Sequence, residues 1–155
     1  MQMSEMLSAG SIVLPLKSTT KKEVIRELLR AVPYDRKAVD EETVYKAILD
    51  REAVTSTGVG EGVAIPHAKC DIREDLVMSF GISAVPVEFD SSDKKPVRLF
   101  FLLLSRKDVS GLHIRMLAKI AKFIRHEKFK NDLLACTSAA AAIELFRREE
   151  SLNFA

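Results

Sequence analysis

The segment STGVGEGVAIPHA, residues 56–68, combines residue types that can hold and accept a phosphoryl group. Its glycines allow backbone amides to converge on an anion, and Ser56 and Thr57 add hydroxyl donors. His67 lies at the far end of the segment. Because an imidazole with an ordinary pKa of about 6.5 is mostly neutral near pH 7, a ring nitrogen can attack phosphorus without a separate base. The segment therefore predicts phosphoryl capture by the histidine, with an anion-accepting turn beside it.

Two residues outside the segment match the other needs of such a transfer. A migrating phosphoryl group requires positive charge at its oxygens and an in-line approach of the nucleophile. Arg51 precedes the segment, and its guanidinium can grip two oxygens, although an arginine at a helix C-terminus is also explained by the helix dipole. His113 falls in the first turn of a predicted helix, where free amides favour an anion. A buried histidine with a satisfied hydrogen bond accounts for it equally well, so both interpretations stay open.

Other glycine-based sites fit the sequence less well. A dinucleotide fingerprint requires GxGxxG before a helix, whereas these glycines run GxGxG and precede VAIP, which favours a strand. The Gly-Lys-Ser/Thr of a Walker loop and the GxSxG of a nucleophile elbow are both absent. Cys70 follows His67 by three residues, but no second histidine or cysteine lies close in sequence. A metal- or nucleotide-binding module remains an alternative, and no metal or cofactor is expected.

Alternating helical and strand patterns predict one domain over residues 1–155, an α/β three-layer sandwich with a mixed central β-sheet flanked by helices. Residues 97–104, VRLFFLLL, are apolar enough for a central strand covered on both faces. Thr19 or Thr20, Asp40 and Ser110 are the predicted helix caps. The predicted helices span residues 20–31, 40–53, 111–125, 127–135 and 138–148, and the predicted strands span residues 62–66, 76–85 and 97–104.

The composition excludes several classes of partner and setting. Lys plus Arg total 24 against 22 Asp plus Glu, so general adhesion to nucleic acid is not expected. Eight basic residues in the range 106–130 lie between apolar positions at helical spacing, which predicts a solvated helix face. The sequence contains no apolar run of about 18 residues, so no membrane span is expected. The N-terminus lacks the pattern of a signal peptide. Two cysteines far apart favour a reduced, cytoplasmic location.

The residues also resemble a known family. Residues 51–68, REAVTSTGVGEGVAIPHA, closely resemble the phosphorylation-site signature of the fructose- and mannitol-type enzyme IIA components of the bacterial phosphoenolpyruvate-dependent phosphotransferase system. Residues 86–124, which contain the apolar strand and the helix that opens with His113, resemble the family's second conserved region. The resemblance implies the mannitol-type enzyme IIA fold and a phosphocarrier that receives its phosphoryl group from phospho-HPr, an HPr-like carrier protein.

The resemblance also implies roles for individual residues. His67 matches the phosphoacceptor, modified on its tele nitrogen Nε2, and His113 matches a supporting active-site histidine. Arg51 matches the arginine that stabilises charge. The turn on the phosphate side corresponds to Ser56, Thr57 and Gly58.

The destination of the phosphoryl group is left open by the resemblance. In sugar-transporting relatives the group passes to an enzyme IIB. A free-standing chain of this length is most similar to nitrogen-regulatory enzyme IIA proteins, which bind target proteins according to their phosphorylation state. A stand-alone sugar-transport enzyme IIA is the alternative, and a homodimer is compatible with either role. Glu61 stands where regulatory members often have Asn or another neutral polar residue.

Overall fold

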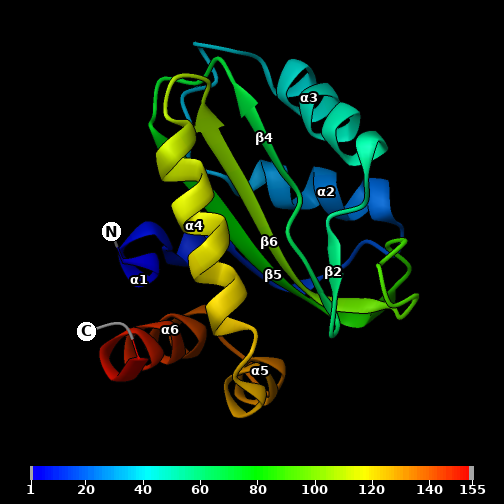
Figure 1. Ribbon diagram of the computed structural model, residues 1–155, viewed down its shortest axis with the longest axis vertical. Helices are drawn as coiled ribbons and strands as arrows, with labels where there is room; N and C mark the ends of the chain where they lie inside the picture. The colour runs from blue at the N-terminus through cyan, green and yellow to red at the C-terminus, as the bar shows by residue number, and fades with distance from the viewer. Residues whose placement is uncertain (1, 154–155) are drawn as a thin grey trace.

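A six-stranded mixed sheet lies between two helical layers in the computed structural model, which describes residues 2–153, apart from the side chain of Asn153 (Figure 1). The strand order is β1-β5-β6-β3-β2, and β4 also pairs with β6. β1 runs parallel to β5, β5 antiparallel to β6, and both β3 and β4 parallel to β6. The strands are β1 (Ile12–Leu16), β2 (Gly58–Gly60), β3 (Val63–Ala64), β4 (His67–Cys70), β5 (Leu76–Val87) and β6 (Val97–Arg106). The predicted three-layer sandwich is confirmed.

The helices divide between the two faces of the sheet. α2 and α3 cover one face, and α1, α4, α5 and α6 cover the other (Figure 1). The helices are α1 (Met3–Met6), α2 (Lys21–Arg30), α3 (Glu41–Val54), α4 (Ser110–Phe123), α5 (Glu127–Leu134) and α6 (Ala139–Asn153), and a short 3-10 helix, η1 (Ala9–Ser11), precedes β1. Within the described residues, no helix is both long and apolar enough to span a bilayer.

Strand β6 is the centre of both cores. Phe100, Leu102 and Leu104 pack with α2 and α3, whereas Phe101 and Leu103 pack with α4, α5 and α6. The prediction of a central, doubly covered strand is therefore confirmed, because alternate residues of one strand supply two hydrophobic cores. The same alternation turns the strand's later odd-numbered positions toward α4.

Two of the three predicted helix caps are confirmed. The Thr20 hydroxyl accepts a hydrogen bond from the Glu23 amide, and the Asp40 carboxylate accepts one from the Thr43 amide. The third prediction is wrong, because Ser110 is the first residue of α4 and Val109 occupies the cap position without a side-chain hydrogen bond. The Ser110 hydroxyl instead accepts a hydrogen bond from Lys69 of β4.

Three strands were not predicted from the sequence. β1 contains Pro15, a residue that disfavours strands but is tolerated at the edge of a sheet, where β1 lies. The strand predicted over residues 62–66 is limited to Val63–Ala64, with β2 before it and β4 after it. β2 and β4 are too short and too rich in glycine or polar residues for an alternating pattern to reveal them.

The turn between β2 and β3 contains three successive residues with positive φ. Gly60 and Gly62 have φ of 92° and 76°, and Glu61 between them has φ of 57°. Glycine adopts such values without steric cost, whereas the Cβ of a glutamate approaches a neighbouring carbonyl oxygen. Glu61 therefore carries a local conformational cost in this hairpin.

We expect Glu61→Asn to raise the free energy of unfolding by about 0.5 to 1 kcal/mol, because asparagine tolerates the left-handed conformation better. Little is lost in exchange, since the exposed Glu61 carboxylate lies 3.8 Å from Nζ of Lys130, and this lysine also bonds the Glu61 carbonyl. Urea unfolding measures the change. Glu61→Ala is the matched control, since it removes the carboxylate without the asparagine amide. An equal gain for both variants would contradict the conformational explanation.

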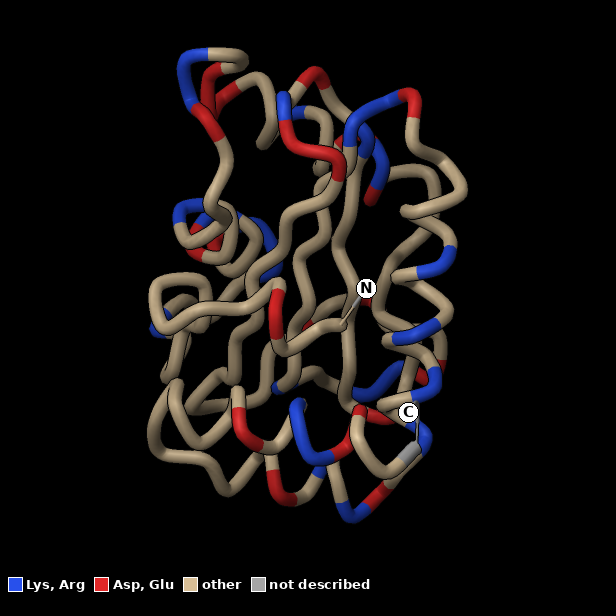
Figure 2. Tube along the Cα trace, turned by 90° about the vertical axis from the view of Figure 1, so that its left-hand side faces the viewer, with Lys and Arg blue, Asp and Glu red and all other residues tan. Residues whose placement is uncertain are grey.

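The basic residues of the range 106–130 do not all form the solvated face that the sequence predicts. Lys130 is buried and pairs with Glu127, and Lys119 is largely buried and pairs with Glu150. The ammonium groups of both lysines reach carboxylates. Figure 2 shows positive and negative residues intermingled over most of the chain, whereas α4 carries basic residues and no acidic residue.

Candidate active site

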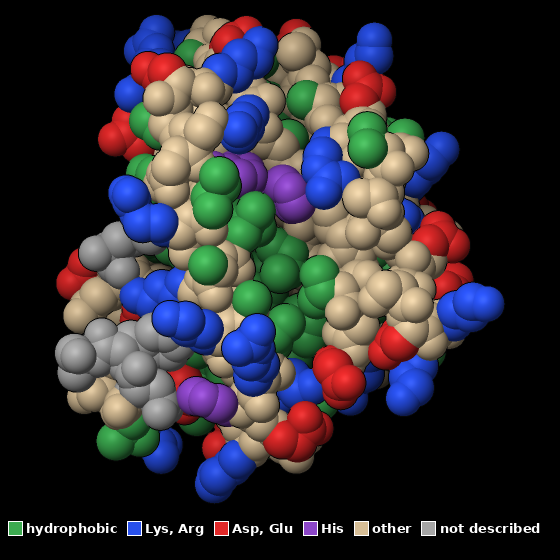
Figure 3. All heavy atoms as spheres, in the orientation of Figure 1, with side chains coloured by type: hydrophobic (Ala, Val, Ile, Leu, Met, Phe, Trp, Pro, Cys, Tyr) green, Lys and Arg blue, Asp and Glu red, His purple; other side chains and the backbone are tan. Residues whose placement is uncertain are grey.

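A cavity of about 410 Å³ lies where α3, β4 and α4 meet. Figure 3 shows two adjacent histidine side chains in a hollow of this face, with Lys and Arg side chains around them and hydrophobic side chains below. His67 and His113 are neighbours, with ring centroids 5.2 Å apart. The lining residues are Ala47, Arg51, His67, Ala68, Lys69, His113 and Leu117. The structure thus brings the two histidines and the arginine predicted from the sequence to one site.

His67 is the first residue of β4, and its ring orientation is fixed by a backbone contact. Nδ1 lies 2.7 Å from the carbonyl oxygen of Ile65. Because a carbonyl oxygen can only accept, Nδ1 carries the proton, and a neutral ring then leaves a lone pair on Nε2. Burial lowers the pKa of His67, and the charges of Arg51 and Lys69 lower this pKa further, against the Ile65 hydrogen bond that raises it. His67 is therefore held in its neutral, nucleophilic form.

His113 lies in the first turn of α4 and is 4% exposed. Its Nδ1 lies 2.5 Å from the Ser105 hydroxyl oxygen on β6. Burial lowers the pKa of His113 to about 4, and the charges of His67, Lys69 and Arg51 act in the same direction. At neutral pH this ring is uncharged, so it can offer a hydrogen bond to an anion but no charge.

The positive charge of the cavity comes from Arg51 and Lys69. Arg51 lies in the last turn of α3, and its guanidinium donates to the Thr55 carbonyl at 3.0 Å. Lys69 Nζ donates to the Ser110 hydroxyl at 2.9 Å, which connects β4 to the start of α4. Both cations line the same cavity as His67.

Sequence reasoning missed Lys69, although a signal was present. In a strand, residues two apart point to the same face, so a strand starting at His67 places Lys69 beside it. The predicted strand ended at Pro66, and the alternation was therefore not extended past the histidine. The pairing of His67 with Leu103 of β6 shows that the strand continues.

Ser56, Thr57 and Gly58 do not line the cavity, and their polar groups have partners within the protein. The Ser56 hydroxyl donates to the Phe89 carbonyl and accepts from the Gly58 amide, and the Thr57 hydroxyl and amide both donate to buried Glu52. A Cβ at position 58 would approach Cα of Ser91 to 2.9 Å, so close packing explains this glycine. Their contact with phosphate stays a prediction.

Cys70 does not complete a metal site with His67. Because the two residues are three apart in β4, they point to opposite faces, and Cys70 packs in the core beneath α2 and α3. Burial raises the pKa of its thiol to about 11, which disfavours the thiolate that binds metals. Within the described residues, no three His, Cys, Asp or Glu side chains form a group that could hold a metal ion.

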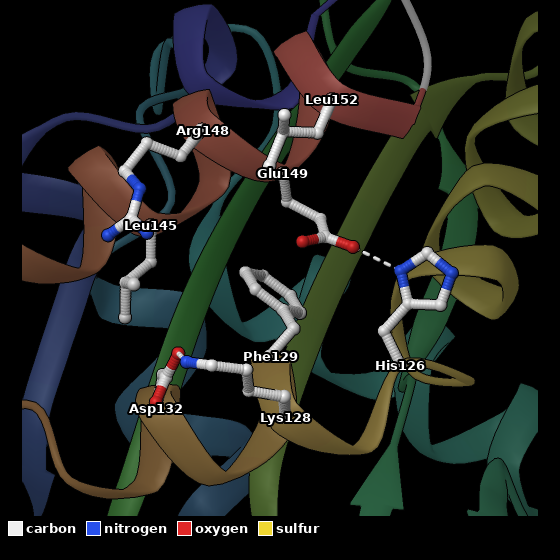
Figure 4. A pocket seen from close by; sticks show the side chains of 8 residues that line it. All are labelled: His126, Lys128, Phe129, Asp132, Leu145, Arg148, Glu149 and Leu152. Carbon is white, nitrogen blue, oxygen red and sulfur yellow. Dashed lines mark hydrogen bonds and ion pairs between the residues drawn. The ribbon is translucent and has the colours of Figure 1, made fainter.

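The third histidine lies in a separate hollow of about 340 Å³ between α5 and α6. Nδ1 of His126 pairs with the Glu149 carboxylate, beside the ring of Phe129 (Figure 4). From its sequence neighbours we expect an exposed histidine without a role, but its side chain is half-buried and bonded. It lies on elements that do not line the cavity of His67, so it serves as a control position.

The low pKa of His113 predicts a loss of stability in mild acid. The unfolded chain takes up a proton on this histidine near the ordinary pKa of 6.5, whereas the folded protein does so only near about 4. The stability is therefore complete above pH 6.5 and decreases as the pH falls toward 4. We expect His113 alone to lower the free energy of unfolding by about 2 kcal/mol between about pH 8 and about pH 5.

Urea unfolding of the wild type and His113→Gln across this pH range measures the effect. The variant removes the titrating group, so its stability is expected to fall less steeply between the same pH values. Parallel curves for the two proteins would contradict the assignment of the low pKa to His113.

The comparison with known families matches residues 5–149 to the model described as "Phosphoenolpyruvate-dependent sugar phosphotransferase system, EIIA 2". The chain is 33% identical over 141 residues to the nitrogen regulatory protein of Bradyrhizobium diazoefficiens, covering 91% of this chain and 92% of that protein. It is 31% identical over 150 residues to the fructose-specific EIIABC component of Bacillus subtilis, covering 97% of this chain. Only 24% of that longer protein is spanned.

Solved structures agree with these relatives. The nitrogen regulatory protein IIA-Ntr of Neisseria meningitidis superposes with a TM-score of 0.84 at 30% identity, covering 92% of this chain and 97% of that chain. The Escherichia coli enzyme IIA for mannitol, solved in complex with phosphorylated enzyme IIB, superposes with a TM-score of 0.75 at 27% identity, again covering 92% of this chain and 97% of that chain. The mannitol-type fold expected from the resemblance is confirmed.

Proposed function

Because the chain belongs to the EIIA type 2 family of the phosphoenolpyruvate-dependent sugar phosphotransferase system, we propose that it is a phosphotransferase component that carries a phosphoryl group on His67. The observation that supports this most directly is the hydrogen bond from Nδ1 of His67 to Ile65, which leaves Nε2 with a lone pair in a cavity with two cations. A neutral imidazole nitrogen held beside positive charge is suited to attack phosphorus.

The proposed step exchanges one phosphorus–nitrogen bond for another. The donor is a phosphohistidine of an HPr-like carrier protein. The Nε2 lone pair of His67 forms the new bond to phosphorus, and the donor nitrogen keeps the electron pair of the bond that breaks. The donor ring carries a proton on its other nitrogen, so it leaves as a neutral imidazole. Because the proton of His67 stays on Nδ1, bonded to Ile65, no base is required. The product is a tele-phosphohistidine.

The other residues of the cavity have supporting roles in this proposal. Arg51 and Lys69 supply positive charge for the phosphoryl oxygens, and His113 supplies a neutral donor. The turn formed by Ser56, Thr57 and Gly58 holds the hairpin that leads into β4, and its contact with phosphate requires a shift of the present hydrogen bonds. We further propose that residues 1–155 form a single domain of this family and act in the cytoplasm.

The proposed relay is tested with purified components. Incubation with radiolabelled phosphoenolpyruvate, enzyme I and an HPr-like protein is expected to label the protein to about one group per chain. Omission of the HPr-like protein should prevent labelling, since the donor is its phosphohistidine. Labelling that proceeds equally well without this protein would contradict the proposed donor.

For the onward step we propose regulation of partner proteins by phosphorylation state, with transfer to an enzyme IIB as the second candidate. Regulation is supported by similarity over 92% of the nitrogen regulatory protein of B. diazoefficiens. Transfer is supported by the mannitol relative solved with enzyme IIB and by the fructose-specific relative. A homodimer stays a prediction for either role.

Two measurements separate these roles. Regulation predicts a partner whose affinity for the wild type differs clearly from its affinity for His67→Asp or for His67→Ala. Transfer predicts rapid loss of label to an added enzyme IIB of the fructose or mannitol type. Rapid loss of label without any state-dependent binding would favour the transport role.

A further inference from the structure

Ser105 is a buried hydroxyl beside the active site. It lies near the end of β6, is 0% exposed, and faces α4. Its oxygen lies 2.5 Å from Nδ1 of His113. Within residues 2–153, His113 is the hydrogen-bond partner found for this hydroxyl. The two side chains are eight positions apart in sequence, so β6 and α4 must dock correctly for the contact to form.

The number of hydrogen atoms available indicates which group donates in the hydrogen bond between Ser105 and His113. A hydroxyl has one hydrogen to donate, and a neutral imidazole has one N–H and one accepting nitrogen. If Nδ1 donated to Ser105, the hydroxyl hydrogen would be buried without an acceptor in the described part of the chain, which is unfavourable. If the hydroxyl donates to Nδ1, both atoms are satisfied, and the imidazole proton lies on Nε2.

We propose that Ser105 is a positioning residue that donates to Nδ1 of His113 and so fixes His113 with its proton on Nε2. His67 has the opposite arrangement, because Ile65 accepts from its Nδ1. The ring centroids of the two histidines are 5.2 Å apart, yet their Nε2 atoms differ. Nε2 of His67 has a free lone pair, whereas Nε2 of His113 has a hydrogen to donate.

This distinction assigns different tasks to similar side chains, and it rests on the proposed function of the site. Nε2 of His67 has the lone pair that bonds phosphorus. Nε2 of His113 has a hydrogen that can be donated to a phosphoryl oxygen, and it has no lone pair with which to compete for phosphorus. Without Ser105 the uncharged ring of His113 could populate both tautomers, and one of them would turn a lone pair toward the phosphoryl oxygens.

The tautomers are measured by nitrogen–proton correlation NMR of the unphosphorylated protein. In the wild type we expect a pyrrole-type Nε2 on His113 and a pyrrole-type Nδ1 on His67. Ser105→Ala is expected to populate both tautomers of His113 and to leave His67 unchanged. The matched control is Ser79→Ala, which removes a buried hydroxyl of β5 that donates to the Leu28 carbonyl at 2.8 Å. A pyrrole-type Nδ1 on wild-type His113, or an unchanged tautomer in Ser105→Ala, would overturn the proposal.

The rate of phosphorylation provides a second readout. We expect Ser105→Ala to slow transfer about three- to tenfold, the equivalent of one hydrogen bond, with Ser79→Ala unaffected and Ser105→Thr close to the wild type. A Ser105→Thr variant that folds as stably as the wild type but transfers as slowly as Ser105→Ala would overturn the role of the hydroxyl. Because the NMR measurement needs no phosphoryl transfer, failure of the proposed function would be recognised separately, by absence of labelling in the wild type.

Discussion

Replacing His67 by alanine is expected to abolish phosphoryl acceptance while the protein stays folded. The residue supplies the nitrogen that would bond phosphorus, and His113 cannot substitute because its Nδ1 is bonded to Ser105 and its ring is buried. The fold should persist, since the His67 side chain contributes one hydrogen bond, to Ile65, a contact of about 1 kcal/mol. Labelling with phosphoenolpyruvate, enzyme I and an HPr-like protein measures acceptance.

The control for this experiment is His126→Ala. This histidine lines the hollow between α5 and α6 and contacts Glu149, so its removal should leave labelling unchanged. Circular dichroism of both variants establishes that they are folded. Wild-type labelling of His67→Ala would exclude His67 as the acceptor.

Replacing Arg51 by alanine is expected to slow transfer by about a hundredfold or more without unfolding the protein. Loss of one preorganised charge partner of a reacting group typically costs about 3 to 4 kcal/mol at the transition state. The guanidinium lines the cavity of His67, and its hydrogen bond to the Thr55 carbonyl lies in an exposed position. Single-turnover transfer from a phosphorylated HPr-like protein measures the rate.

Arg51→Lys separates charge from geometry in the same assay. Lysine keeps the positive charge but cannot grip two oxygens in a plane, so we expect a rate between those of the wild type and Arg51→Ala. Arg30→Ala, at the exposed end of α2, is a control for the loss of a helix C-terminal arginine. An unchanged rate for Arg51→Ala would leave this residue with a structural role only.

The large elements could be predicted from the sequence because each has a strong local pattern. Thr20 and Asp40 are efficient caps, and the apolar run of β6 has the composition of a strand with two covered faces. β1, β2 and β4 lack such a pattern. β1 and β4 pair with β5 and β6 through tertiary contacts that single-sequence periodicity does not contain, and β2 pairs with β3 in a short hairpin.

Part of the site could also be predicted from the sequence. His67, Arg51 and His113 are of residue types that suit phosphoryl transfer, and the fold brings all three to one cavity. Lys69 became apparent only once the strand was seen to begin at His67. Ser105 has no signal of its own, since a serine at the end of an apolar strand is unremarkable until α4 places an imidazole against it.

The expected roles of the glycine-rich segment are the most changed by the structure. The polar groups of residues 56–58 form hydrogen bonds with one another, with Glu52 and with Phe89. The turn at residues 60–62 leads the chain into β3. The segment therefore acts first as a scaffold that delivers His67 to the start of β4. Anion binding by its amides would require that these hydrogen bonds be exchanged for bonds to phosphate.

The most direct test of the account is phosphorus and nitrogen NMR of the phosphorylated wild-type protein. We predict one phosphohistidine, on His67, with phosphorus bonded to Nε2 and with the proton of Nδ1 retained in its bond to Ile65. Phosphorus on Nδ1 of His67, on His113, or on any other side chain would contradict the account.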